Sequence, residues 1–559
     1  MIRSVVARRS TCTLRSTFLS LTLLLLLGCA PGDRPAEVTA DTGYDALAAL
    51  FEDWRAFEKP AFIDGVPDYT APAMERQRRE LPRYQRRLAA IDTTGWPVSD
   101  QVDYWIVRAE MNGLDFYHRV SRPWANNPAF YVMIFPSRSD VPAHEGPVMH
   151  GWIDLWTRDY PLEPDAAAEL AGWIASIGPV LEQARGNLTG NARDLWRGGI
   201  RAMAGQSRDL RSLAARLAGT DDRLDDAIEA ALRATDAFAD WLEEEAPSKT
   251  GPSGIGVDNY TWYERNVHLV PYSWAEQVTM LRRELARSNA TLLLEENRNR
   301  DLPRLERIDS AEEYDRRLNQ AVTDYIEFYD DEEIITVRDY FDEALRERIG
   351  RFSPAEGLRG FFSEVIYRDP LTMRTHGHHW IDLAMMDTEP HSSPIRRVPH
   401  LYNIYDSRSE GIATGMEEWM MHAGLFDESP RSRELILILI AQRAARALGG
   451  LMMHANEWTI DEAVEYAARW TPRGWMPEDS STVWGEQHFY LTQPGYATSY
   501  LVGKHQIEQL MAERALQLGD AFTLKGFFDE MHDCGVIPTS LLRWEMTGRT
   551  DEIDQLRQW

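Results

Sequence analysis

Cysteine is scarce in this chain, which contains three in 559 residues. Cys12 and Cys29 lie near the N-terminus, and Cys534 stands alone in the remainder of the sequence. We therefore expect no disulfide within the main body. A cysteine-based zinc site and a cysteine nucleophile are also not expected, because Cys534 has no partner motif. A chain of this length can bury a sufficient core without covalent cross-links.

Basic side chains are also in short supply. The sequence has 60 Lys and Arg against 88 Asp and Glu, which gives a formal net charge of −28. This balance argues against nucleic acid and anionic membrane surfaces as partners, because both attract clustered positive charge. The sequence also lacks a P-loop, a dinucleotide-binding glycine motif and a GxSxG motif in a convincing context. It therefore gives no support to those enzyme classes.

The first 29 residues resemble a lipoprotein signal. Four arginines precede an apolar run, 18–27, that is too short to span a bilayer comfortably. The run leads into Leu-Leu-Gly-Cys, a lipobox, which predicts cleavage before Cys29 and lipidation of that residue. An ordinary secretory signal with a chance cysteine is the alternative. Acyl chains give a stable anchor, and Ala30, where an aspartate would favour the inner membrane, predicts the outer membrane facing the periplasm.

A polar, proline-containing segment, 30–44, is typical of a flexible tether. We expect no segment after residue 30 to be long and apolar enough to cross a membrane. Membrane contact is therefore expected through the lipid anchor alone, with the acidic body held away from the cell-envelope surface.

Apolar residues recur at helical spacing in the main body. Those within 224–242 fall on one helix face. A Ser-Pro pair can open a helix that carries the apolar run 435–447, and Thr459 with Glu462 forms a capping-box pattern. Few segments alternate with a period of two. The sequence therefore predicts an all-α fold with many helices.

A loop rich in Pro, Ser and Gly, 247–256, divides the body. It separates an N-terminal helical half, 45–246, from a C-terminal helical half, 247–559. These are either halves of one fold or two closely packed domains, and length does not decide between them. The N-terminal half shows no obvious chemistry, whereas nearly every combination of histidine and glutamate lies in the C-terminal half.

Three histidines gather around Gly377 and are followed by Glu410. A catalytic zinc takes about three nitrogen or oxygen ligands and leaves one position for water, and a nearby carboxylate accepts the proton of that water. Two of His376, His378 and His379, together with Glu410, are the candidate metal ligands. The alternative is a histidine-rich turn that is hydrogen-bonded in a cleft.

Several blocks of the C-terminal half are similar, in order and spacing, to a large bacterial family known as domain of unknown function 885. Its members resemble all-helical zinc peptidases of the HExxH type. The resemblance therefore implies a helical fold with a deep central cleft. The similar blocks are GVDNY at 256–260, SPIR at 393–396, EGIA at 410–413 with Glu417, Arg446 with MH at 453–454 and WT at 458–459, and PGYA at 494–497 with Tyr500 and Lys504.

The family's first metal motif reads HExxPGHH, and this chain departs from it. Aligning 377–379 with GHH places Thr372 and Met373 where the family has His and Glu, and His376 where it has Pro. A later block that resembles FHD has Phe528 in place of its histidine. One expected ligand and the expected general base are therefore missing, since a methionine accepts no proton.

The resemblance and the residue chemistry together assign roles to the remaining polar residues. Glu410 is the expected ligand, and Glu417 or Asp382 is the available base. His454 and Tyr500 lie at matched positions and are candidates for catalytic stabilisation of an oxyanion. The alternatives are a solvated acidic helix face for the glutamates, a satisfied core position for the histidine and a packed core position for the tyrosine.

Lys504 lies one helical turn from Tyr500, and Arg446 belongs to a matched block. Both are candidates for binding a substrate carboxylate. The alternative for Lys504 is a solvated side chain.

Two functions remain open. The first is a metal-dependent hydrolase of peptides or other small amides, with zinc as the expected metal. The second is a catalytically degenerate family member, a periplasmic binding or scaffold protein that does not cut. The matched blocks favour the first function, and Thr372 with Met373 favours the second.

Overall fold

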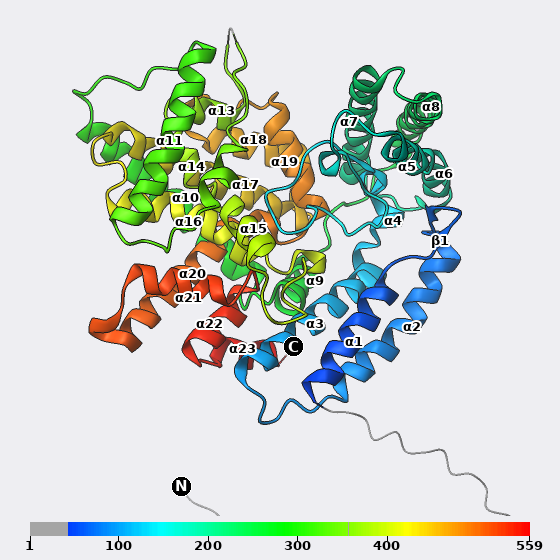
Figure 1. Ribbon diagram of the computed structural model, residues 1–559, viewed down its shortest axis with the longest axis horizontal. Coiled ribbons are helices and arrows are strands. Elements are labelled where there is room, and N and C mark those ends of the chain that lie inside the picture. Colours follow the sequence, from blue (N-terminus) through cyan, green and yellow to red (C-terminus); the bar gives the residue numbers. More distant parts are fainter. Residues whose placement is uncertain (1–42, 356, 559) are drawn as a thin grey trace, which may run out of the picture. The chain divides into compact units, whose positions relative to one another are not determined.

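Helices form nearly all of the secondary structure in the computed structural model, which describes residues 43–355 and 357–558 (Figure 1). The all-α prediction is confirmed. The predicted signal 1–29, its lipidation site Cys29 and residues 30–42 of the predicted tether lie outside the described residues. Two short strand pairs accompany the helices: β1 (Phe62–Ile63) with β2 (Val66–Pro67), antiparallel, and β3 (Ile134–Phe135) with β4 (Ile153–Asp154), parallel.

The described residues, 43–355 and 357–558, cluster into one unit, and the boundary between the two predicted halves stays a prediction. The helices before that boundary are α1 (Tyr44–Glu58), α2 (Ala71–Ala89), α3 (Val98–Phe116), η1 (Tyr117–Ser121), α4 (Pro123–Asn126), η2 (Pro128–Tyr131), η3 (Leu155–Thr157), α5 (Pro164–Ala175), α6 (Ile177–Asn187), α7 (Arg193–Leu217), α8 (Asp222–Glu245) and η4 (Ala246–Ser248), which crosses it. Among them, α5, α6 and α7 pack around α8.

The C-terminal part holds the remaining helices, in which η5 is π-helical, as is η1, and the other η segments are 3-10 turns. They are α9 (Val257–Tyr263), η5 (Glu264–His268), α10 (Trp274–Arg298), α11 (Ala311–Asp331), α12 (Phe341–Arg346), α13 (Phe361–Ile366), α14 (Leu371–Arg374), α15 (His378–Thr388), η6 (Leu401–Asn403), α16 (Asp406–Ala423), α17 (Pro430–His454), α18 (Ile460–Trp470), η7 (Pro472–Gly474), α19 (Ser481–Thr492), α20 (Tyr496–Leu518), η8 (Gly519–Ala521), α21 (Leu524–Asp533), α22 (Thr539–Thr547) and α23 (Asp551–Leu556).

Local sequence signals explain several helix ends. Asp221 caps α8 by accepting from the backbone of the first turn, and the apolar stripe 224–242 of that helix is buried. α17 begins at Pro430. Proline suits this position because the N–H of the first helical residue has no partner within the helix. Both arms of the predicted capping box between Thr459 and Glu462 are present at the start of α18. These three local predictions are confirmed.

α17 is the core helix of the C-terminal part, and it packs against α10, α18 and α20. Every residue from 434 to 454 is buried. By length and composition α17 is apolar enough to cross a membrane, with a mean hydropathy of 1.6, although all of that stretch is buried within the fold. The expectation that no such segment follows residue 30 is therefore wrong. Its burial is that of a core helix.

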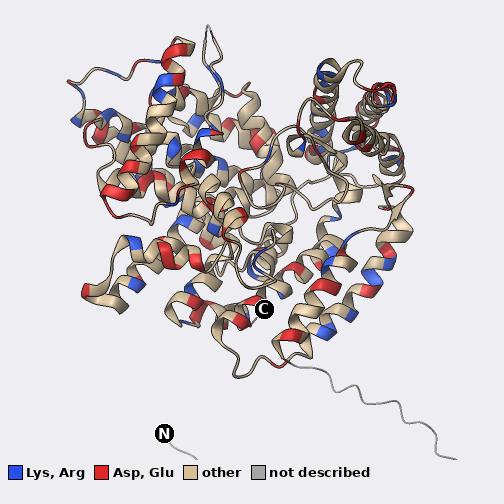
Figure 2. Cartoon of the chain, in the orientation of Figure 1, with Lys and Arg blue, Asp and Glu red and all other residues tan. Residues whose placement is uncertain are grey.

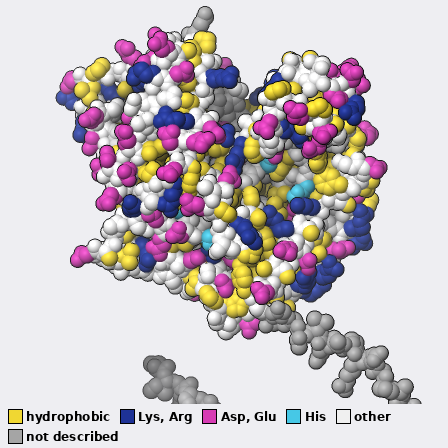
Figure 3. Space-filling view, viewed as in Figure 1, with side chains coloured by type: hydrophobic (Ala, Val, Ile, Leu, Met, Phe, Trp, Pro, Cys, Tyr) yellow, Lys and Arg dark blue, Asp and Glu magenta, His cyan; other side chains and the backbone are white. Residues whose placement is uncertain are grey.

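Acidic and basic side chains are interspersed over the face of the molecule that Figures 2 and 3 show. The helix α2 departs from this pattern, because its sequence holds six arginines and two glutamates. Some of these arginines pair with acids, as Arg78 does with Glu75. α2 thus carries a local basic face that the net charge conceals, and the exclusion of anionic partners stays a prediction.

Two glycines bring α16 and α20 into close contact. A Cβ added to Gly411 would lie 2.5 Å from the backbone carbon of Gly503, and a Cβ at Gly503 would lie 2.0 Å from the backbone oxygen of Ser407. Side chains larger than hydrogen do not fit at this crossing. The close approach places Glu410 of α16 within hydrogen-bond distance of Tyr496 of α20.

Candidate functional site

The three histidines of the predicted motif do not share one site. α14 ends at Arg374 and α15 begins at His378, so His376 lies in the turn between them. Gly377 completes this turn, where a Cβ would lie 2.8 Å from the backbone oxygen of Arg374. His376 and His379 meet one set of partners, and His378 meets another. The turn therefore divides the motif between two clusters.

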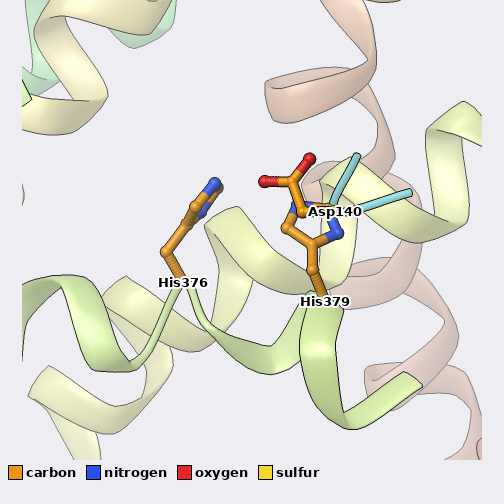
Figure 4. A group of neighbouring side chains, drawn as sticks. All are labelled: Asp140, His376 and His379. Carbon is orange, nitrogen blue, oxygen red and sulfur yellow. The ribbon is translucent and has the colours of Figure 1, made fainter. Parts of the chain in front are cut away.

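The first histidine cluster consists of Asp140, His376, His379 and Glu410. One nitrogen or oxygen atom from each of Asp140, His376 and His379 lies within 4.8 Å of the other two. The two imidazole rings meet edge to face, with centroids 5.0 Å apart, and Figure 4 shows the Asp140 carboxylate beside them. Glu410 Oε2 lies 3.3 Å from His379 Nε2. Two imidazoles and the Asp140 carboxylate thus converge, and the Glu410 carboxylate contacts one of the two imidazoles.

The His379–Glu410 pair is buried, yet the two facing atoms, Nε2 and Oε2, have no hydrogen-bond partner. Burial lowers the pKa of His379, but the Glu410 carboxylate outweighs this effect and the pKa rises to about 9. Burial raises the pKa of Glu410, and the charge of His379 brings it below its usual value. A shared cation would satisfy such a pair of facing atoms. Solvent reaches the cluster through the half-buried His376 and Asp140.

A phenol joins two carboxylates beside this cluster. The Tyr496 hydroxyl lies 2.8 Å from Glu410 Oε1 and 2.7 Å from Glu145 Oε1. One phenolic proton serves one of these contacts, so the other contact requires a proton on a carboxyl group. Burial, followed by the charge of Asp140, raises the pKa of Glu145 to about 7. A carboxyl group that titrates near neutrality is suited to general acid–base chemistry.

Glu417 is held in a buried ion pair. Its two oxygens accept hydrogen bonds from the guanidinium of Arg443 at 2.7 Å each, and Oε1 lies 3.0 Å from His376 Nδ1. Burial raises the pKa of Glu417, but Arg443 and His376 bring it below its usual value. Arg443 Nη2 also lies 3.2 Å from His376 Nδ1, so the Glu417–Arg443 pair holds this nitrogen and leaves Nε2 of the ring for the first cluster.

The second histidine cluster consists of His378, Asp382 and His532. His378 Nε2 lies 3.0 Å from His532 Nε2, which in turn lies 3.5 Å from Asp382 Oδ1. Arg408 donates two hydrogen bonds to Asp382, at 2.9 and 3.0 Å. Burial raises the pKa of Asp382, but Arg408 lowers it to about 2. The structure thus places His378 and Asp382 together, in a different cluster from His376 and His379.

Two predicted catalytic residues occupy different surroundings. His454 donates from Nε2 to the backbone oxygen of Tyr490 at 2.9 Å, and burial lowers its pKa to about 4, which is the behaviour of a neutral core histidine. Tyr500 packs edge to face against Tyr496 with centroids 5.4 Å apart. Tyr500 therefore borders the first cluster, whereas His454 is committed to a backbone contact.

The predicted substrate-binding residues are both paired. Arg446 forms an ion pair with Glu486, and its guanidinium lies 5.7 Å from the centre of the Tyr500 ring. Lys504 contacts Glu418 at 2.7 Å and Glu508 at 2.6 Å, and these residues line a separate pocket. The roles assigned to Arg446 and Lys504 stay predictions.

The residues that depart from the family motif make ordinary hydrogen-bonding and packing contacts. The Thr372 hydroxyl donates to the backbone oxygen of Asp369 at 2.6 Å, and Met373 packs against the core around α17. Phe528 packs on Trp419. One helical turn after Phe528 on α21, His532 supplies the imidazole that faces the second cluster.

The fold and these clusters define an all-helical protein with histidine–carboxylate groups buried between its helices. A model of the family described as "Bacterial protein of unknown function (DUF885)" matches residues 377–546. The predicted resemblance is thereby confirmed over that segment, which begins immediately after His376. The likeness to zinc peptidases and the deep central cleft stay predictions. No curated protein matches this sequence.

Two solved structures are similar to this chain. A candidate lipoprotein of unknown function from Shewanella oneidensis superposes with a TM-score of 0.67 at 13% identity, covering 90% of this chain and 99% of that one. A candidate lipoprotein from Colwellia psychrerythraea gives a TM-score of 0.65 at 15% identity, covering 93% of this chain and 100% of that one. At these identities the likeness establishes the fold alone.

Four residues of the two clusters and their surroundings were not anticipated. Asp140 and Glu145 lie in the loop 136–152 between β3 and β4, in the half where the sequence shows no obvious chemistry. Tyr496 belongs to the matched PGYA block, which was a usable signal. His532 lies four residues after Phe528, so a search for a histidine on the same helix face would have found it.

Proposed function

We propose that this chain is a metal-dependent hydrolase of peptides or other small amides, with its reaction centre at the first histidine cluster. The observation that carries the proposal is the buried His379–Glu410 pair, whose facing atoms lie 3.3 Å apart without a hydrogen bond. One donor atom each of His376 and Asp140 lies within 4.8 Å of a donor atom of His379. Such convergence of nitrogen and oxygen donors is typical of a divalent metal site.

Zinc is the metal that this donor set fits best. Zinc takes histidine nitrogens and carboxylate oxygens, and a catalytic site keeps one position open. The second nitrogens of the two imidazoles also have partners, because Glu417 lies beside His376 and Ser409 lies 3.2 Å from His379 Nδ1. Partners of this kind fix ligand orientation in metal sites. When bound, the metal would polarise a carbonyl group and lower the pKa of a water molecule.

The surrounding residues have distinct roles in this proposal. Glu145, whose pKa lies at about 7, accepts a proton from the attacking water and returns it to the leaving amine. Tyr496 holds Glu145 against Glu410. Tyr500, which packs against Tyr496, and Arg446, whose guanidinium lies 5.7 Å from the centre of the Tyr500 ring, are proposed to bind the developing oxyanion or a substrate carboxylate. Glu417 positions His376 through their 3.0 Å contact and is not the base.

The location proposed for the enzyme is the cell envelope. Cys29 would carry the lipid anchor, and the body would face the periplasm from the outer membrane. The description of the two similar structures as candidate lipoproteins supports an anchored protein. The choice of the outer membrane rests on Ala30 alone.

A second function, a binding or scaffold protein without hydrolysis, is favoured by one observation. Thr372 and Met373 occupy the positions of the family's histidine and glutamate, and neither supplies a ligand to the described clusters. In that case the predicted central cleft would hold a peptide or small amide without cutting it.

Metal content and turnover of the full-length protein, purified in detergent, test the proposal. We expect stoichiometric zinc by elemental analysis and hydrolysis of a peptide library that a chelator abolishes and zinc restores. Glu410→Gln should lose both properties. His422→Gln on the same helix is the matched control, because His422 is 61% exposed.

The outcomes separate the two functions. Metal binding and peptide binding without turnover would favour the scaffold function. Absence of zinc from the wild type, with unchanged behaviour of Glu410→Gln, would overturn both the metal site and the hydrolase.

A further inference from the structure

The second histidine cluster also presents three donor atoms to one point. His378 and Asp382 are four residues apart on α15 and share a helix face. His532 reaches them from α21, which is far along the chain. The side chains of Asp382 and His532 are 4% and 3% exposed, and His378 is fully buried. We propose that His378, Asp382 and His532 bind a second divalent transition-metal ion, such as zinc, independently of the first cluster.

The donor separations agree with this assignment. A tetrahedral zinc with bonds of about 2.0–2.1 Å holds its ligand atoms about 3.3 Å apart. The separation is 3.0 Å between the two Nε2 atoms and 3.5 Å between His532 Nε2 and Asp382 Oδ1. All three donor atoms lie within 4.8 Å of one another. A small movement of the side chains would complete the coordination.

Each α15 donor is already oriented by a neighbour. The Tyr329 hydroxyl lies 3.1 Å from His378 Nδ1, which fixes the ring with Nε2 toward the cluster. Arg408 donates to both oxygens of Asp382. Hydrogen bonds that orient ligating side chains are a regular feature of metal sites, and Arg408 holds the Asp382 carboxylate through both of its oxygens, Oδ1 included.

A route to the site is present. A cavity of about 300 Å³ is lined by Asp382, His532 and Arg408. This cavity gives an ion access to the otherwise buried donors and provides space for a water in the fourth position. The two imidazole ligands suit zinc and its neighbours in the first transition row better than calcium or magnesium, which prefer sites made of oxygen ligands.

The competing arrangement is a direct hydrogen bond between the imidazoles, in which one Nε2 donates to the other. That pairing needs one proton and no metal. The two arrangements differ in what removal of His532 does, because only the metal site loses an ion. They also differ when another metal-binding residue replaces His532, because only the metal site can then form a bond between that residue and the ion.

Cobalt titration of the full-length protein in detergent is the experiment. After chelator treatment, the wild type should bind about two cobalt equivalents, one at each cluster. His532→Gln should lose one equivalent, and His376→Gln should lose the other. His422→Gln should keep both. If His532→Gln binds as much cobalt as the wild type, the second site is overturned, whatever happens at the first.

A ligand-swap variant makes the test independent of folding losses. His532→Cys keeps a metal-binding atom at this position, so its cobalt form should show a thiolate-to-cobalt charge-transfer band in the near ultraviolet. The wild type, whose buried Cys534 is free, should not show it. Absence of the band, together with an unchanged cobalt stoichiometry in His532→Gln, would overturn the proposal. If the band is present and His376→Gln still loses only the ion of the first cluster, the second site stands even if the proposed hydrolase fails.

Discussion

Replacement of Glu417 by glutamine removes one half of a buried ion pair. The side chains of Arg443 and Glu417 are 1% and 0% exposed, and two hydrogen bonds of 2.7 Å join them. Glutamine keeps the shape and one acceptor oxygen, but it leaves the Arg443 charge buried without a counter-charge. Loss of one partner from a buried pair destabilises by about 3–5 kcal/mol. We expect Glu417→Gln to lower the free energy of unfolding by about 3 kcal/mol or more.

Urea denaturation followed by circular dichroism, with chelator present, measures this loss without a contribution from metal binding. Glu313→Gln is the control, because Glu313 and Arg316 form an exposed pair on α11 that should contribute little. A double Met variant at 417 and 443 leaves no unpaired charge and should lose less than the two single changes together. If Glu417→Gln lost no more stability than Glu313→Gln, the reasoning that a buried charge pair anchors His376 would be refuted.

Three further outcomes are expected. Gly411→Ala should destabilise by about 1–3 kcal/mol in urea, because its Cβ would meet Gly503 at 2.5 Å; Gly485→Ala, where a Cβ meets nothing within 4 Å, should not, and equal effects would contradict the close crossing. Burial lowers the pKa of His454 from 6.5 to about 4. Below pH 6.5 the unfolded chain therefore binds a proton at this residue and the folded chain does not. The free energy of unfolding is thus highest above pH 6.5 and falls by about 3 kcal/mol as the pH drops toward 4. His454→Gln should therefore reduce the change in the urea midpoint between pH 7 and pH 5. An unchanged pH dependence of the midpoint would count against a neutral buried imidazole. Tyr496→Phe should weaken zinc binding about 10–100-fold in a chelator competition, because its phenol bridges Glu410 of the first cluster and the neighbouring Glu145; unchanged affinity would exclude that role.

The helices were predictable where the signal is local. The stripe at 224–242, the start of α17 and the capping box at Thr459 each depend on residues within one or two turns. Such patterns predict a structure because the backbone meets its hydrogen-bonding needs within the same segment. Apolar length alone is less reliable: α17 has the composition of a membrane span and is a buried core helix.

The candidate site was only partly predictable, because its members meet through tertiary contacts. The motif placed His376, His378 and His379 in one group, and no spacing rule indicated that the turn at Gly377 separates His378 from its neighbours. Glu410 was found through a matched block. Asp140 lies in an irregular loop, where sequence periodicity carries no information about what the loop approaches.

The phenol that joins Glu145 to Glu410 has a consequence for how the chain folds. Tyr496 and Glu145 are 351 residues apart in sequence. Bringing the ends of so long a segment together costs about 5 kcal/mol of chain entropy before any contact stabilises the pair. Contacts of this separation form late in folding. Because Tyr496 orients Glu410 of the first cluster, a metal held firmly there would report that α20 has been made and that the loop 136–152 has docked, so ion capture would mark a late stage of folding.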